Sequence, residues 1–250
     1  MSQSNEIPLP DADIRIVPVV LLVDVSGSMN DKVSGTGNDD GSRKIEVVNK
    51  YMRQFFDELA KMSDLSTELD VCIISFSTNA RVDLNLCSVD QAAWSDLKAD
   101  GTTNFTEALQ KAKEIIENRN LMPKNCGRPS LLLISDGQPY PANNWKAVLD
   151  DFVKNGRTAI CDRFSLGIGK ETDYNVLSMF ASKPEYVFEA QNVMSIGEFF
   201  HYVSTHTQTK TRAGAPGSAS ASNASTTKPF VTVSRTSTSN STPKKRNPFM

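Results

Sequence analysis

The sequence predicts a three-layer, Rossmann-like α/β fold, in which a mainly parallel, doubly wound sheet with one antiparallel edge strand lies between helices on both faces. Two observations carry this prediction. Apolar runs of strand length alternate with amphipathic helix-like segments almost throughout residues 14–207, and such alternation is typical of a parallel sheet with crossover helices. The first run, 17–23, is apolar at nearly every position, as expected for a strand that is covered on both faces.

Hydrophobic periodicity predicts the elements of the first half of the chain. Residues 44–62 place their apolar side chains on one helical face, and 69–76 form a second apolar strand. Residues 80–86 alternate apolar and polar side chains after the turn-like segment 77–79, which predicts a hairpin partner for the second strand. The apolar spacing over 105–116 predicts another amphipathic helix.

The second half of the chain continues the same alternation of strands and helices. We expect short buried and edge strands separated by amphipathic helices, and a final helix that ends the folded region. The expected strands are 130–134, 158–168 and 186–188, and the expected helices are 145–153, 174–180 and 196–203. Counting the hairpin strand as the third, a doubly wound sheet would have the order 3-2-1-4-5-6.

Composition divides the chain into a folded body and less regular segments. Residues 1–13 are a polar extension, 14–207 form the domain, and the polar, Gly-rich segment 30–42 reads as a mobile insertion next to the first strand end. Residues 208–250 are basic and rich in Ser and Thr without helical periodicity, and too few apolar side chains are present to offset the entropy of ordering. We therefore predict a disordered tail.

Charge and cysteine content narrow the function classes. The net charge is −2, but 1–207 holds 20 basic and 29 acidic residues, and an acidic body with a basic tail is atypical of a nucleic-acid-binding domain. The longest apolar run is far shorter than the roughly 20 residues that span a bilayer. The four cysteines are scattered without a CxxC pair, and residues 1–15 are polar, contain acids and show no apolar core of the kind that secretory signals have. We expect a cytoplasmic protein that binds neither nucleic acid nor membrane.

Oxygen-bearing side chains follow two strands that the predicted order makes neighbours. Asp24, Ser26 and Ser28 come directly after the first strand, and Asp136 follows the fourth. Ligands gather at the carboxyl ends of such strands, near the point where the strand order reverses. If Asn104 caps the following helix with a capping box to Glu107, the hydroxyl of Thr103 is free to face the same edge. Oxygen ligands suit Mg²⁺, Mn²⁺ or Ca²⁺ far better than zinc.

The segments DVSGSM, GTTN and ISDGQP resemble the metal-ion-dependent adhesion site (MIDAS) of von Willebrand factor A (VWA) domains. The family pattern is D-x-S-x-S, a separate threonine and a separate aspartate, and all five positions occur in order over about 14–207. The resemblance implies that Ser26, Ser28 and Thr103 contact the cation, while Asp24 and Asp136 hold ordered waters and hydroxyls. It also implies an open position for water or an acidic side chain of a partner.

The resemblance implies a non-enzymatic adaptor or scaffold that binds an Asp or Glu of a partner protein through Mg²⁺, or through Mn²⁺ or Ca²⁺. Within the family the chain looks most similar to bacterial cytosolic stand-alone members encoded near tellurium-resistance genes. Some of those accompany a Ser/Thr kinase and a metal-dependent phosphatase. The tail could serve as a kinase substrate, because phosphates would reverse its charge. Ordinary disorder explains its composition equally well.

Two other functions remain open from the residues alone. A phosphatase-like hydrolase would use Asp24, but such enzymes of this sheet type need a second carboxylate two residues on, where this chain has Ser26. A serine hydrolase needs a base and G-x-S-x-G, which is missing, and His201 and His206 lie together near the end of the last helix, where we expect them to be exposed. A metal-independent structural adaptor recruited by its tail is the other alternative.

Overall fold

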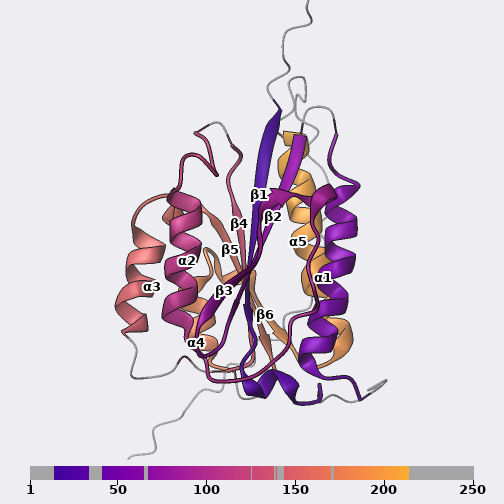
Figure 1. Cartoon of the computed structure of the whole chain (residues 1–250), viewed down its shortest axis with the longest axis vertical. Coiled ribbons are helices and arrows are strands. Elements are labelled where there is room, and N and C mark those ends of the chain that lie inside the picture. The colour runs from indigo at the N-terminus through magenta and orange to yellow at the C-terminus, as the bar shows by residue number, and fades with distance from the viewer. Residues whose placement is uncertain are drawn as a thin grey trace, which may run out of the picture.

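A computed structural model gives the structure of the protein, and it describes residues 14–33, 41–64, 67–124, 126–137, 139, 144–169 and 172–213. Six strands form one sheet in the order β3-β2-β1-β4-β5-β6 (Figure 1). Among them, β3 pairs antiparallel with β2, and the other neighbours pair parallel. The predicted fold class and strand order are confirmed. The strands are β1 (Arg15–Asp24), β2 (Thr67–Phe76), β3 (Ala80–Ser88), β4 (Ser130–Ser135), β5 (Asp162–Ile168) and β6 (Val187–Ala190).

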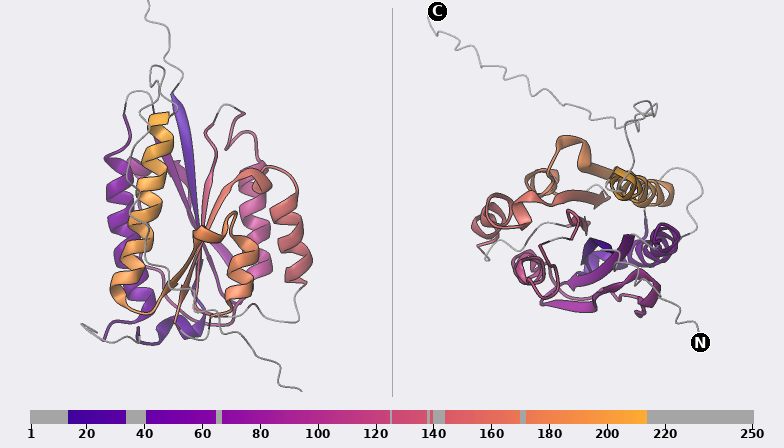
Figure 2. Two further views of the ribbon diagram at one scale, coloured as in Figure 1. Left: turned by 180° about the vertical axis from the view of Figure 1, so that it is seen from behind. Right: turned by 90° about the horizontal axis from the view of Figure 1, so that it is seen from above.

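Helices cover both faces of the sheet (Figures 1 and 2). One face carries α1 and α5, and the other carries α2, α3 and α4. Alternate residues of β1 serve the two layers: Leu21 and Val23 pack with the α1 side, and Val20 and Leu22 pack with the α2 side. This double burial explains the unbroken apolar run of the first strand. The helices are α1 (Lys44–Ala60), α2 (Phe105–Glu117), α3 (Trp145–Lys154), α4 (Tyr174–Phe180) and α5 (Val193–Ala213).

Several boundaries differ from the sequence prediction. The expected strand 158–168 begins only at Asp162, because Thr158–Ile160 form the short 3₁₀ helix η3. The Thr158 hydroxyl donates to the carbonyls of Phe152 and Asn155 at 2.5 and 3.1 Å, and these bonds hold the chain in a turn at the end of α3. At the other end of the domain, α5 continues to Ala213, past the expected start of the tail at 208.

The parallel strands direct their carboxyl ends to one edge of the sheet, the lower end in Figure 1. There β1 leads into the short 3₁₀ helix η1 (Gly27–Asn30). The backbone N–H of Val33 donates to the carbonyl of Ser42 at 3.1 Å, which closes the base of the expected insertion. Residues 34–40 of that insertion, the extension 1–13 and the tail from 214 lie outside the described residues. Among the described helices, none is both long and apolar enough to cross a bilayer.

Candidate metal centre

Two carboxylates lie buried at this edge of the sheet, at the ends of neighbouring strands. Asp24 is the last residue of β1, Asp136 follows β4, and they are 0% and 2% exposed. Oδ1 of Asp24 accepts from the backbone N–H of Ser26 at 2.8 Å, and Oδ2 accepts from the hydroxyl of Ser135 at 2.6 Å. Asp24 is therefore bonded both to the loop that follows it and to the end of β4.

The two serines of the first loop link the carboxylates. The hydroxyls of Ser26 and Ser28 lie 3.1 Å apart, and Ser28 donates to Oδ1 of Asp136 at 2.8 Å. Ser26 is buried, whereas Ser28 is exposed. Ser26 and Ser28 thus connect two buried carboxylates, and the connection passes through Ser28 at the surface.

Backbone hydrogen bonds fix the loop that carries Thr103 against the first loop. The N–H of Gly27 donates to the carbonyl of Gly101 at 2.9 Å, and that of Asp100 donates to the carbonyl of Val25 at 2.7 Å. An ideal Cβ built on Gly137 would lie 3.6 Å from the Thr103 hydroxyl and 4.0 Å from Oδ2 of Asp24. The three predicted segments therefore converge around Gly137.

The expected helix cap that frees Thr103 is present. Oδ1 of Asn104 accepts from the N–H of Glu107 at 3.4 Å at the start of α2. The predicted capping box is only half formed, because the carboxylate of Glu107 accepts instead from the N–H of Ala80 at 2.9 Å. The cap thus joins α2 to the β2–β3 hairpin, and Thr103 takes no part in it.

Sequence reasoning missed two side chains of this cluster. The first residue of α1, Lys44, donates from Nζ to Oδ2 of Asp136 at 2.6 Å, and its side chain is only 11% exposed. Ser135 bonds Asp24 from the end of β4. A serine directly before Asp136 at a strand end was a signal for Ser135. No local pattern singles out Lys44, because its position depends on how α1 returns to the sheet.

The electrostatics of the cluster favour a cation. Burial raises the pKa of Asp24 to about 6, because the carboxylate has lost its water; the hydrogen bonds from Ser135 and Ser26 offset this in part, and the charge of Asp136 adds to it. A divalent ion would compensate such a buried charge. The donor set of two carboxylates and three hydroxyls, Ser26, Ser28 and Thr103, consists of oxygen alone and so fits a hard cation.

Within the described residues, no group of three or more His, Cys, Asp or Glu side chains could hold a metal ion, and the candidate centre itself combines only two carboxylates with hydroxyls. The two histidines lie on α5, far along the chain from Asp24. His201 is exposed as expected, but His206 is half-buried, with Nε2 3.5 Å from a carboxylate oxygen of Asp162 at the start of β5. The expectation that both are exposed is wrong for His206, because α5 packs against β5.

Comparison with known proteins supports the fold that the structure shows. Residues 19–138 match the family described as von Willebrand factor type A domain. The inter-alpha-trypsin inhibitor heavy chain H2 of Mesocricetus auratus is 28% identical over 202 residues, covering 75% of this chain and 20% of that protein. That of Mus musculus is 28% identical over 205 residues, with the same coverage. The chain therefore spans about a fifth of the length of these curated relatives.

Solved structures show the same architecture at low sequence identity. The von Willebrand factor type A structure from Catenulispora acidiphila has a TM-score of 0.56 at 17% identity and covers 78% of this chain and 43% of that one. Proximal thread matrix protein 1 from the mussel byssus, solved with a zinc-occupied MIDAS motif, has a TM-score of 0.56 at 16% identity, with coverages of 78% and 46%. At these identities the likeness supports the fold alone.

Proposed function

Because this chain contains a von Willebrand factor type A domain, a module known for protein–protein interaction, we propose that it binds a partner protein through a divalent cation held at the MIDAS-like cluster. The cluster of Asp24, Ser26, Ser28, Thr103 and Asp136 is the observation that carries this proposal. The proposed role is that of a non-enzymatic adaptor or scaffold, and the partner contributes an Asp or Glu carboxylate to the cation.

The division between buried carboxylates and outer hydroxyls supports this role. Ser28 is exposed and Thr103 is half-buried, so the cation they contact would lie near the surface, within reach of another protein. Asp24 and Asp136 lie deeper: Asp24 accepts from the backbone N–H of Ser26, and Asp136 accepts from the hydroxyl of Ser28. A cation with few directly bound carboxylates stays electrophilic, and Mg²⁺ usually keeps several waters that an anionic ligand can replace.

Thermal unfolding in the presence of single metal ions tests the cation. Mg²⁺, Mn²⁺ or Ca²⁺ at about a hundred times its dissociation constant should raise the melting temperature by about 5 °C or more, because only the folded state assembles the cluster. Zn²⁺ belongs in the same series, since the mussel protein holds zinc at its own MIDAS motif. Excess EDTA should reverse the increment.

Variants separate a specific site from a general salt effect. Asp24→Asn and Ser28→Ala should abolish the increment while leaving the circular dichroism spectrum unchanged. Ser95→Ala is the matched control, because Ser95 is exposed and lies outside the cluster. An increment that persists in both cluster variants would refute metal binding at this edge of the sheet.

A metal-independent adaptor is the alternative that one observation favours. The carboxylates of Asp24 and Asp136 already have hydrogen-bond partners within the chain, including the ammonium of Lys44. A pull-down with and without EDTA, using the full chain, distinguishes the two functions by whether partner capture depends on the cation. A Ser/Thr kinase and a phosphatase are the partners to test first. The cytoplasmic location and the relation to the tellurium-resistance group stay predictions.

A further inference from the structure

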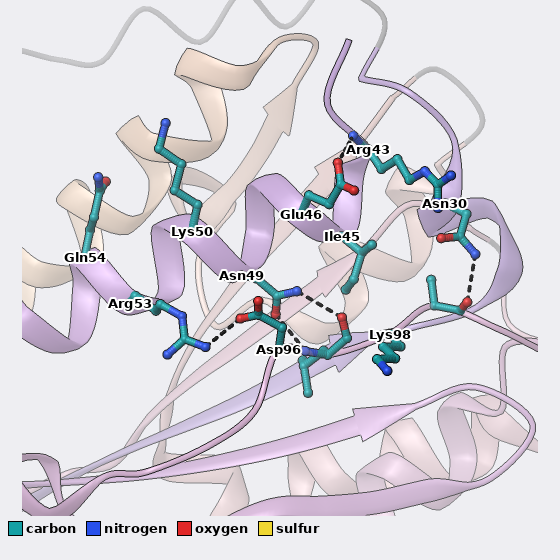
Figure 3. Close-up of a pocket in the computed structure, with 12 residues that line it drawn as sticks. Asn30, Arg43, Ile45, Glu46, Asn49, Lys50, Arg53, Gln54, Asp96 and Lys98 are labelled. Carbon is teal, nitrogen blue, oxygen red and sulfur yellow. Dashed lines mark hydrogen bonds and ion pairs between the residues drawn. The ribbon is translucent and has the colours of Figure 1, made fainter. Parts of the chain in front are cut away.

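A groove of about 800 Å³ lies between α1 and the segment 96–99 (Figure 3). Side chains of α1 line one side, and residues 96–99 line the other. The groove includes Asn30, in the same short helix as Ser28, and Arg43, which precedes Lys44. The groove and the metal centre are therefore built from adjoining chain segments. Its volume falls within the roughly 300–1,000 Å³ that is typical of ligand sites.

The non-helical wall of this groove is held rigidly. Residues 92–100 form neither helix nor strand, yet both backbone groups of Leu97 bond the side chain of Asn49 on α1, at 2.9 and 3.0 Å. The amide of Asn30 donates to the carbonyl of Ala99 at 2.7 Å. Because these bonds exist before any ligand arrives, binding in the groove requires little further ordering of the wall.

The groove carries an excess of positive charge on a chain whose net charge is −2. One of its two acids, Asp96, pairs with Arg53 at 2.6 Å, and the other, Glu46, accepts from the backbone N–H of Arg43. Three cationic side chains of the groove form no ion pair with any other described residue. These are Arg43, Lys50 and Lys98.

We propose that the groove binds an acidic segment of the partner, directly adjoining the carboxylate that reaches the metal centre. This inference rests on the proposed function and adds the chemistry of the neighbouring partner residues. Arg43 and Lys50 lie two helical turns apart, about 10 Å along α1. About three residues of extended peptide cover that length. A polypeptide fits better than a nucleic acid, since the acidic body would repel a continuous polyanion.

Fluorescence anisotropy of two labelled peptides tests the groove with the full-length protein in Mg²⁺. Both peptides have eight residues: one contains a single aspartate among glycine and alanine, and the other has three glutamates directly after that aspartate. The glutamate peptide should bind about fivefold more tightly, because each exposed ion pair contributes modestly. Equal affinities for the wild type would overturn the proposal.

The double variant Lys50→Gln/Lys98→Gln should remove this preference. The matched control is Lys61→Gln/Lys124→Gln, which lowers the net charge equally at exposed lysines outside the groove, and it should keep the preference. If the preference survives in the groove variant, or disappears in both, the peptide is attracted by overall charge and the groove is not its site.

The same assay separates failure of the groove from failure of the metal centre. EDTA should weaken binding of the single-aspartate peptide, which reports only on the metal centre. If EDTA has no effect but the groove variant still loses the glutamate preference, the metal function fails and the groove stands. If EDTA releases both peptides and the preference is absent, the metal function stands and the groove proposal fails.

Discussion

The ammonium of Lys44 donates to Oδ2 of Asp136 at 2.6 Å, while Oδ1 of the same carboxylate accepts from Ser28 at 2.8 Å. The side chain of Asp136 is completely buried, and that of Lys44 is nearly so. With Asp24 and Asp136 ionised, the cluster carries one net negative charge rather than two. A divalent cation would turn this into one net positive charge, which attracts an anionic ligand.

Replacing Lys44 with methionine should therefore raise the affinity of the centre for Mn²⁺ by at least about tenfold, because a nearby positive charge no longer repels the ion. Isothermal titration calorimetry measures the change. The control is Lys50→Met, which removes a lysine of the same helix outside the cluster and should leave the affinity unchanged. An affinity of Lys44→Met equal to or below that of the wild type would contradict this role.

In the absence of metal, Lys44→Met should instead be less stable than the wild type. Asp136 would lose a buried ionic partner, so the free energy of unfolding in EDTA should fall by about 3 kcal/mol. Urea denaturation measures this loss, and added Mn²⁺ should restore much of it. Unchanged stability in EDTA would mean that the Lys44–Asp136 contact contributes little to the folded state.

Gly101 controls the position of the Thr103 loop. Its φ of +83° lies in the left-handed region, and a Cβ there would meet the Thr78 hydroxyl at 2.5 Å. Gly101→Ala should therefore lower the free energy of unfolding by about 2 kcal/mol. It should also weaken metal binding, since the loop that carries Thr103 must shift.

Thr102→Ala is the comparison for that experiment. Its contacts with the Thr78 hydroxyl are long, 3.3 Å from the backbone and 3.5 Å from the side chain, and alanine adds no clash. We expect a change within about 0.5 kcal/mol in urea denaturation. If the two variants are equally destabilised, backbone strain at Gly101 is not the cause.

A charged cluster at the opposite edge of the sheet predicts the response to acid. Burial alone would raise the pKa of Asp162, but hydrogen bonds from His206 and Lys210, with the charges of Lys210 and Arg128, hold this pKa well below its usual value. A lowered pKa in the folded state contributes stability above the ordinary value of about 4, and this stability is lost as the pH falls further. Asp162 thus favours folding at neutral pH.

Asp162→Asn should lower the free energy of unfolding by about 3 kcal/mol at neutral pH, because Lys210 loses its carboxylate partner. The difference from the wild type should narrow steadily below about pH 4, as protonation weakens the same pair in the wild type. Urea denaturation at several pH values measures it. The control is Asp150→Asn, which removes an exposed helical pair with Lys154 and should change the free energy of unfolding only slightly at every pH. If the difference between Asp162→Asn and the wild type stayed constant with pH, the lowered pKa of Asp162 would not be the source of the stability.

The sheet and most of the candidate centre followed from local patterns. Hydrophobic periodicity predicted the strands, and the doubly wound topology predicted their order, which places the carboxyl ends of β1 and β4 side by side. The five oxygen-bearing residues could then be placed at the same edge of the sheet from their positions at strand ends and at the start of a helix. The assignment of these residues as metal ligands stays a prediction.

Contacts that depend on how the chain folds back against the sheet could not be predicted from the sequence. The N–H of Lys44 donates to the carbonyl of Asp31 at 3.0 Å, so η1 and the start of α1 are tied together across the insertion. Nothing in the sequence near Lys44 encodes that distance. Similarly, the strand expected from Thr158 onward does not begin there. The hydroxyl of Thr158 donates to carbonyls at the end of α3, and these hydrogen bonds hold this segment away from the sheet.

The attachment of residues 92–100 to α1 leads to the last prediction. Asn49 is buried, and it is bonded to both the N–H and the carbonyl of Leu97. Asn49→Ala would leave two backbone groups without partners, and should lower the free energy of unfolding by about 2–3 kcal/mol. Hydrogen exchange of the amide of Leu97 should accelerate at the same time, while Mg²⁺ binding stays unchanged, because the ligand loops keep their own backbone bonds.

Gln54→Ala provides the reference for this variant, since Gln54 is an exposed groove residue of the same helix. It should leave both stability and exchange near the wild-type values. If Asn49→Ala also left the exchange of Leu97 unchanged, the wall of the groove would be held by its outer contacts alone, the Arg53–Asp96 pair and the Asn30–Ala99 hydrogen bond. Acceleration in Asn49→Ala alone would place the rigidity of the wall in the Asn49–Leu97 pair.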